Sequence, residues 1–286
     1  DVGTTNLKAG VVDESGSVLA LRRVQTPVVR PEHGAAEHDP SELYDMLISV
    51  AREVTQKYKH DIEHIVLSTY QLGLIFVDAH LNPLTGLTLL SDMRARETIE
   101  DFKKLLDLKD LYKRTGCPPM FQYPLARIHY FRERRPEIFS RTRYFLGSKD
   151  YLLLRLTGEL LTEPSTAVAT QMFNIKTLDW DMLALKAVGV EKRQLPRVVD
   201  GMRTAIPVLE SVRKELGLTS TALDVFPGVY DGGALAVGLG GLKENVGVMN
   251  IGTSAMVRVP GREPVFDTSE NMRLQPYCLA EKLYLN

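Results

Sequence analysis

The arrangement best suited to chemistry in this sequence is one carboxylate followed by two glycines. Asp231 ends the apolar run 222–230 and precedes Gly232, Gly233 and a predicted small-residue helix over 234–239. A strand that ends where a helix begins can present a carboxylate to a cleft, and glycine lets a ligand approach because it has no Cβ. Spacing alone favours a plainer interpretation, in which Asp231 only caps the helix.

Two turns rich in hydroxyl groups are suited to binding phosphate. Gly-Thr-Thr at 3–5 follows Asp1 and a short predicted strand, and Gly-Thr-Ser at 252–254 follows a predicted buried strand over 247–251. Backbone N–H groups and hydroxyls in such turns donate hydrogen bonds to phosphate oxygens. A lone Gly-Thr-Ser is more often an ordinary turn. The prediction therefore depends on both turns together with Asp231.

Several short motifs follow one another in a specific order. They are Asp-Val-Gly-Thr-Thr at 1–5, Lys-Asp-Tyr at 149–151, Leu-Thr-Gly-Glu at 156–159, Ser-Thr-Ala at 165–167 and Gly-Thr-Ser at 252–254. By this ordered set the sequence resembles the FGGY family of carbohydrate kinases, within the superfamily of sugar kinases, Hsp70 and actin. The resemblance covers the whole chain but only the front part of the family's length. Because the chain starts inside a motif and stops in a predicted strand, we expect a fragment of a longer protein.

The resemblance implies roles for the residues around both turns. Asp231 becomes the catalytic base that takes the proton of a sugar hydroxyl, with Gly232 beside the substrate. Asp1 becomes a direct or water-mediated ligand of Mg²⁺, a cation that prefers carboxylate and phosphate oxygens. The phosphates of ATP are implied to bind Gly3, Thr4, Thr5, Asn6, Lys8, Gly252, Thr253 and Ser254. Without the resemblance, Asp1 and Lys8 would be explained as solvated surface charges.

The implied sugar pocket departs from the pattern of the family. Where relatives commonly have Gly-Gln-Met-His or Asn-Gln-Arg-Glu, this chain has Tyr70, Gln71 and Leu72 between Thr69 and Gly73. At 89–94 it keeps the family's Asp92 and Arg94 but has Leu90 in place of an aromatic residue. The five candidate sugar contacts in these two stretches are Tyr70, Gln71, Leu72, Asp92 and Arg94. The alternatives are that Tyr70 and Leu72 pack between strands, and that Asp92 caps a helix.

The elements that must position these residues alternate between strands and helices. Apolar periodicity and turn residues predict a hairpin over 2–24, a helix from 40 to about 58, strands over 64–69, 74–78 and 143–146, and helices over 94–106 and 125–133. The resemblance implies an α/β fold of the ribonuclease H or actin-like ATPase type, with a mixed five-stranded sheet and flanking helices. We expect a sugar-binding domain over 1–240 and the start of a second, similar nucleotide-binding domain over 241–286, with a hinge near Gly240.

Composition excludes several classes of function. The chain has 286 residues, 44% hydrophobic and 25% charged, with a formal net charge of -1. This balance gives no reason to expect nucleic acid or an acidic membrane surface as a partner, and no apolar run reaches the roughly 20 residues of a membrane span. Two cysteines cannot form a metal site by themselves, so we expect reduced thiols in a cytoplasmic protein.

The favoured function is ATP-dependent phosphorylation of a hydroxyl group on a sugar, sugar acid or polyol. In this reaction a protein mainly aligns the acceptor with the γ-phosphorus and neutralises negative charge. The alternative is a regulatory protein of the same fold that binds nucleotide and sugar but has lost catalysis. Asp231 argues for the enzyme, and the altered 70–72 signature argues for the regulator. The expected partners are the sugar and ATP, with a homodimer left open.

Overall fold

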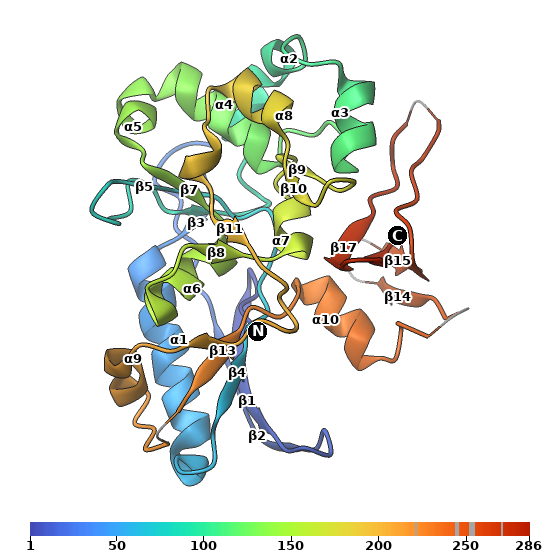
Figure 1. Cartoon of the computed structure of the whole chain (residues 1–286). Helices are drawn as coiled ribbons and strands as arrows, with labels where there is room; N and C mark the ends of the chain where they lie inside the picture. Colours follow the sequence, from blue (N-terminus) through green and yellow to red (C-terminus); the bar gives the residue numbers. More distant parts are fainter. Residues whose placement is uncertain (221, 244–245, 252–254, 270) are drawn as a thin grey trace.

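The computed structural model describes residues 1–286 except 221, 244–245, 252–254 and 270 (Figure 1). Its helices are α1 Pro40–Thr55, α2 Ile99–Phe102, α3 Leu108–Thr115, α4 Pro124–Arg134, α5 Pro136–Arg141, α6 Ser148–Thr157, α7 Pro164–Val168, α8 Met182–Val188, α9 Glu210–Glu215 and α10 Asp231–Gly238, with 3-10 turns η1 Gln56–Tyr58, η2 Arg94–Thr98 and η3 Lys192–Gln194. Its strands are β1 Asn6–Val12, β2 Val18–Gln25, β3 Glu37–His38, β4 His64–Val66, β5 Ile75–Val77, β6 Leu87–Thr88, β7 Tyr144–Leu146, β8 Leu161–Thr162, β9 Phe173–Asn174, β10 Asp179–Trp180, β11 Arg197–Val198, β12 Ile206–Pro207, β13 Asp224–Phe226, β14 Val248–Ile251, β15 Ala255–Arg258, β16 Pro260–Gly261, β17 Tyr277–Ala280 and β18 Leu283–Leu285. This mixed α/β order agrees with the predicted fold class.

The predicted N-terminal hairpin is confirmed. β1 and β2 pair antiparallel from Asn6 opposite Gln25 to Val12 opposite Val18. The turn between them closes because the Asp13 carboxylate accepts hydrogen bonds from the backbone N–H groups of Ser15 and Ser17, each at 2.9 Å. The hairpin therefore carries the 3–5 turn at its open end, beside the start of β1.

Among the described residues, the strands form several small sheets instead of the single five-stranded sheet that we expected. β13 lies between β12 and β4, antiparallel to the first and parallel to the second. In the described part of the chain, the β1–β2 hairpin meets this mixed sheet at a parallel bridge between Val2, which precedes β1, and Thr69, which follows β4. Beyond this bridge β1 and β4 diverge around an apolar gap of about 410 Å³, lined in part by Leu7 and Leu67.

Local chemistry explains where the helices begin and end. Asp39 caps α1, because its carboxylate accepts the N–H groups of Ser41 and Glu42 at 2.9 Å, and Pro40 occupies the first helical position. The expected 40–58 helix is thus α1 followed by η1. The expected 94–106 helix is wrong in length: η2 and α2 end at Phe102, and Thr98 between them leaves helical geometry at φ -113°.

The buried apolar side chains form three clusters. One joins α1, α6, β4 and β13, a second surrounds α4, α8 and β5, and a third, smaller one lies between α10, β14, β17 and β18. None of the described helices is long and apolar enough to cross a bilayer. The third cluster attaches the C-terminal strands to the helix that begins at Asp231.

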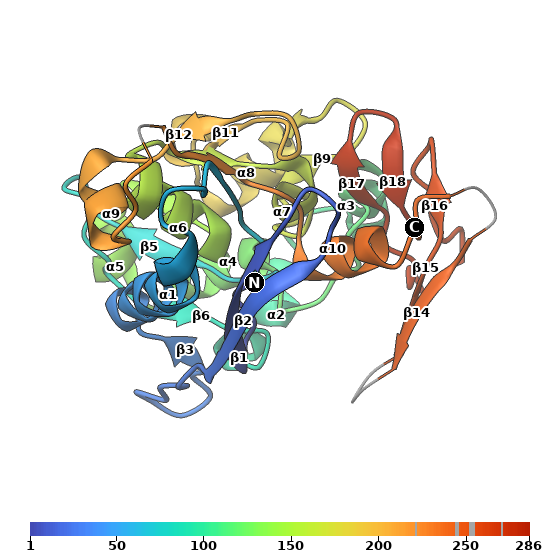
Figure 2. The same cartoon turned by 90° about the horizontal axis from the view of Figure 1, so that it is seen from below.

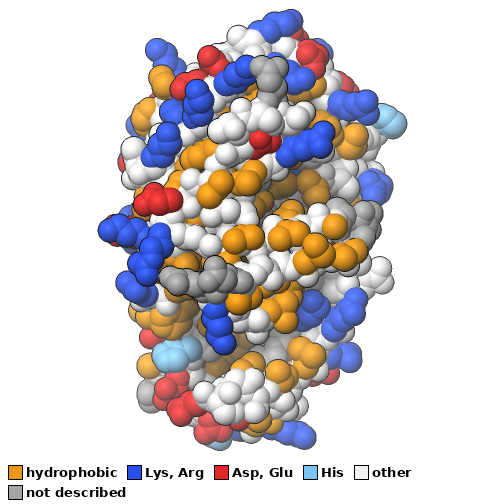
Figure 3. All heavy atoms as spheres, turned by 90° about the vertical axis from the view of Figure 1, so that its right-hand side faces the viewer, with side chains coloured by type: hydrophobic (Ala, Val, Ile, Leu, Met, Phe, Trp, Pro, Cys, Tyr) orange, Lys and Arg blue, Asp and Glu red, His pale blue; other side chains and the backbone are white. Residues whose placement is uncertain are grey.

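The strand predicted as buried over 247–251 is largely exposed. In β14 only Val248 is buried, while Met249 is 58% and Ile251 76% exposed. The reason is that β14 pairs only with β15, as a two-stranded ribbon that extends from the body of the molecule (Figure 2). Hydrophobic side chains consequently gather on the face of the molecule that carries these strands (Figure 3).

Candidate active site

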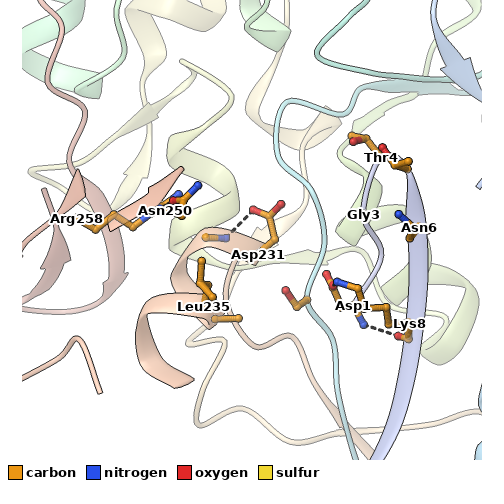
Figure 4. Close-up of a pocket in the computed structure, with 13 residues that line it drawn as sticks. Asp1, Gly3, Thr4, Asn6, Lys8, Asp231, Leu235, Asn250 and Arg258 are labelled. Carbon is orange, nitrogen blue, oxygen red and sulfur yellow. Dashed lines mark hydrogen bonds and ion pairs between the residues drawn. The ribbon is translucent and has the colours of Figure 1, made fainter. Parts of the chain in front are cut away.

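A cleft of about 550 Å³ lies between the start of β1 and the start of α10 (Figure 4). Its described lining comprises Asp1, Gly3, Thr4, Thr5, Asn6, Lys8, Ser68, Asp231, Gly232, Ala234, Leu235, Asn250 and Arg258. The structure thus brings together the two segments that the sequence analysis paired, the 1–8 segment and Asp231–Gly232. The predicted contacts Gly252, Thr253 and Ser254 lie outside the described residues.

Asp231 is the first residue of α10, and its side chain is exposed to the cleft. Its carboxylate accepts the N–H group of Gly232 at 2.7 Å, so it partly caps the helix and still faces the opposite wall (Figure 4). Desolvation by the surrounding protein raises its pKa, although the Gly232 N–H, Arg258, Lys149 and Lys8 all oppose this rise. A carboxylate with a raised pKa is better suited to accept a proton near neutral pH than an ordinary one.

A chain of buried polar groups fixes the backbone that carries Asp231. Lys149 pairs with Glu163 at 2.8 Å, and both side chains are completely buried. Glu163 accepts the Ser165 hydroxyl at 2.7 Å, and the Ser165 oxygen accepts the backbone N–H of Tyr230 at 3.0 Å. The Lys-Asp-Tyr and Ser-Thr-Ala motifs therefore act on Asp231 through its neighbour Tyr230.

The backbone at Gly228, in the segment that leads to Asp231, crosses the backbone at Gly201 at very short range. The N–H of Gly228 donates to the carbonyl of Gly201 at 2.8 Å. A Cβ on Gly201 would lie 2.1 Å from the Gly228 oxygen, and Gly228 itself has φ +63°, which disfavours any side chain. Glycine is required at both positions for the two backbones to touch.

The turn at 3–6 forms the opposite wall of the cleft. Gly3 donates its N–H to the carbonyl of Asn6 at 2.9 Å, and a Cβ on Gly3 would meet that same oxygen at 2.9 Å. Further along the wall, the Lys8 ammonium pairs with the Asp1 carboxylate at 2.9 Å (Figure 4). This wall therefore presents one acid, one cation and a row of small polar residues.

Five described residues of the cleft were missed from the sequence: Ser68, Ala234, Leu235, Asn250 of β14 and Arg258 of β15. Arg258 is buried, donates to the Asn250 side chain, and donates from Nε to the Tyr230 hydroxyl at 3.1 Å. The Tyr230 ring also stacks on Tyr277, with centroids 4.5 Å apart. The signal that the sequence offered for Arg258 is its position as a single arginine inside the apolar run 255–259.

The altered signature residues do not belong to the described lining of the cleft. Tyr70 is buried, and its hydroxyl lies 3.3 Å from Nδ1 of His38. Gln71 donates to the backbone carbonyl of Ser165 at 3.0 Å, while Leu72 packs against the second core with φ +65°. For Tyr70 and Leu72 this agrees with the packing alternative, and Gln71 instead supports the Ser165 segment.

Asp92 and Arg94 are bound to one another inside the protein. Arg94 is buried and donates from Nε to the Asp92 carboxylate at 3.1 Å and from Nη1 to Glu32 at 3.0 Å, with Glu37 as a third acidic partner. Burial opposes the charge of Arg94, yet its bonds to Asp92 and the charge of Glu37 raise its pKa further above the usual range. Neither side chain belongs to the described lining of the Asp231 cleft.

One carboxylate on the 1–8 wall of the cleft, that of Asp1, is suited to Mg²⁺. The described residues contain no group of three His, Cys, Asp or Glu side chains that could hold a metal ion. Mg²⁺ in nucleotide sites commonly uses one or two carboxylates plus phosphate oxygens. Asp1 on one wall, with its second carboxylate oxygen free of the Lys8 pair, fits that pattern.

Sequence comparison identifies the class of this protein. The chain belongs to the FGGY family of carbohydrate kinases, because the model of the N-terminal domain of that family matches residues 1–238.

Individual relatives include kinases for two different acceptors. The chain is 27% identical over 286 residues to a xylulose kinase of Staphylococcus xylosus, covering 100% of this chain and 59% of the relative. It is 29% identical over 283 residues to a gluconokinase of Bacillus subtilis (strain 168), covering 99% and 55%. The crystal structure of a gluconate kinase from Lactobacillus acidophilus superposes with a TM-score of 0.93 at 28% identity, covering 99% and 57%. The chain thus spans little more than half the length of these relatives.

Proposed function

We propose that this chain supplies the acceptor side of an ATP-dependent carbohydrate kinase, which transfers the γ-phosphate to a hydroxyl of a sugar, sugar acid or polyol. The observation that carries the proposal is that Asp231 and the 3–6 turn line the same cleft. The membership in the FGGY family supports it, because the family is one of carbohydrate kinases.

In the proposed reaction the acceptor hydroxyl lies against Asp231. The carboxylate takes the hydroxyl proton while the acceptor oxygen forms its bond to the γ-phosphorus and the bond from that phosphorus to ADP breaks. The 3–6 turn and Lys8 donate to the phosphate oxygens, and Asp1 would hold Mg²⁺, which neutralises phosphate charge when it is bound. We assign residues 1–240 to the acceptor-binding domain and 241–286 to the beginning of a nucleotide-binding domain.

The burial of Tyr70 and the partial burial of Leu72 support a second candidate. In this candidate, the altered signature at 70–72 leaves the acceptor without its usual contacts. The protein then acts as a regulator that binds sugar and nucleotide but does not phosphorylate the sugar. Both candidates share the cleft, and they differ in whether ADP is released.

An acceptor panel distinguishes the two candidates. The full-length protein is incubated with MgATP and pentuloses, hexonates or polyols, while ADP release and acceptor binding are measured separately. A kinase gives ADP release that depends on one class of acceptor. Saturable acceptor binding with no release above the acceptor-free rate would reject the kinase and support the regulator.

A further inference from the structure

A buried histidine lies directly behind the phosphate-binding turn. His38 of β3 is 1% exposed, and its two ring nitrogens face two different partners. Nε2 lies 3.2 Å from the backbone carbonyl of Thr4, and Nδ1 lies 3.3 Å from the Tyr70 hydroxyl. The Tyr70 ring meets the imidazole edge-on, with an angle of 85° between the planes.

These contacts fix which group donates and which accepts in both hydrogen bonds of His38, the one with Tyr70 and the one with Thr4. A carbonyl oxygen can only accept, so Nε2 carries the proton and donates it to Thr4. In neutral imidazole the other nitrogen is then an acceptor, so the Tyr70 hydroxyl donates to Nδ1. Burial lowers the pKa of His38, which favours this neutral form, although the Thr4 carbonyl opposes the shift. Donation therefore proceeds in one direction: Tyr70 donates to His38, and His38 donates to Thr4.

The hydrogen bond from His38 to Thr4 determines which way the backbone N–H groups of the 3–6 turn point. In a trans peptide the C=O and the following N–H point in opposite directions. The Thr4 carbonyl points to His38, so the Thr5 N–H points away from it, on the side where Thr5 lines the cleft. Among the described residues, none accepts a hydrogen bond from the N–H of Thr4 or Thr5. Both donors are therefore available to a ligand.

We propose that His38 is a positioning residue, oriented by Tyr70, which holds the peptide between Thr4 and Thr5 so that its N–H meets an anionic phosphoryl oxygen in the cleft. This rests on the proposed function for the identity of the ligand but not for the geometry. It also gives Tyr70 a role: at this position of the altered signature, its hydroxyl acts on the phosphate turn through His38.

Three substitutions in the full-length protein separate the two hydrogen bonds. H38Q keeps a donor near the place of Nε2, H38N keeps only a group near Nδ1, and Y70F removes the hydroxyl but keeps the ring. We expect H38N to lower kcat about tenfold with little change in the KM for the acceptor, because a misplaced donor is felt in the rate. H38Q retains activity close to wild type, and Y70F lies between them. The exposed His80, substituted to Asn, is the matched control.

Two measurements test the geometry even if no acceptor is phosphorylated. Nitrogen NMR of the imidazole should show the proton on Nε2 of His38. Hydrogen exchange of the Gly3 amide, whose bond to Asn6 closes the turn, should be about tenfold faster in H38N than in H38Q, the effect of losing one ordinary hydrogen bond. A proton on Nδ1, or equal exchange and equal kcat in H38N and H38Q, would overturn the proposal. Failure of the acceptor panel alone would overturn only the kinase assignment.

Discussion

Two groups of charged side chains in this molecule have opposite environments. Asp231 faces a cleft and accepts one hydrogen bond, from Gly232. Asp92 is buried and is bound by Arg94 and by the backbone N–H of Ala36 at 3.1 Å. Both carboxylates match motif positions of the family, but only the first keeps oxygen lone pairs for a substrate. The comparison shows that two acids at motif positions of one family can differ in environment: the fold saturates Asp92 with hydrogen bonds and leaves Asp231 accessible from a cleft.

The sharpest test of this comparison is Asp231→Asn. We expect kcat to fall by about 100-fold or more, since the amide cannot accept the hydroxyl proton, while the free energy of unfolding stays close to wild type. Steady-state rates with a coupled ADP assay and urea unfolding measure the two effects. Asp224→Asn in the preceding strand is the control. A rate within twofold of wild type would remove Asp231 from the role of base.

The buried group should show the reverse behaviour. Arg94→Met leaves Asp92 and Glu37 without their cation, so we expect the free energy of unfolding to fall by about 3–5 kcal/mol. Arg22→Met breaks the exposed pair with Glu53 and should cost at most about 1 kcal/mol. Urea denaturation of both variants makes the comparison. Equal losses would mean that burial of the Arg94 cluster has no energetic consequence.

A smaller effect, on both stability and rate, is expected from Ser165→Ala, in the buried chain of polar groups behind Asp231. This change removes the oxygen that accepts the Tyr230 N–H and leaves that donor buried, which costs about 1–3 kcal/mol. Because Tyr230 precedes Asp231, kcat should also fall severalfold. Thr177→Ala, at an exposed position of the loop after β9, serves as the control for losing one hydroxyl. Full activity in a destabilised Ser165→Ala protein would show that the buried chain does not position Asp231.

The smallest expected effect concerns pH. The base works when ionised, and desolvation raises the pKa of Asp231, so kcat/KM should fall on the acid side at a pH above the roughly 3.9 of an ordinary aspartate. Lys8 slightly lowers this pKa, and Lys8→Met should therefore move the acid limb to higher pH. Profiles of kcat/KM at constant ionic strength measure the shift. A limb that moves to lower pH in Lys8→Met would contradict the assignment.

The sequence predicted the cleft where its signals were local. The Asp-Gly-Gly pattern at 231–233 predicted a strand end followed by a helix over 234–239; in the structure the strand ends earlier, at Phe226, and the helix begins at Asp231 itself, in a cleft. That the 1–8 segment lies beside Asp231 was predicted only through the resemblance, because no local pattern relates two segments more than two hundred residues apart.

What was missed depends on contacts between distant segments. Asp92 and Arg94 resemble a pair that grips sugar hydroxyls, but Glu32 and Glu37, about sixty positions earlier, occupy the guanidinium. Arg258 enters the cleft because β15 lies near α10, which no periodicity predicts. The five-stranded sheet was expected from the resemblance, and strand periodicity could not correct that expectation, because it does not report how far two strands diverge.

The crossing of Gly201 and Gly228 has a consequence for mutational scanning of this protein. Neither residue lines the described cleft, yet a side chain at Gly201 would collide with the other backbone and with Glu163. In a library of all single substitutions, these two positions should be as intolerant as Asp231 itself. Loss of function at a position is therefore no guide to its distance from the cleft, because this backbone crossing restricts substitution as strictly as a lining residue would.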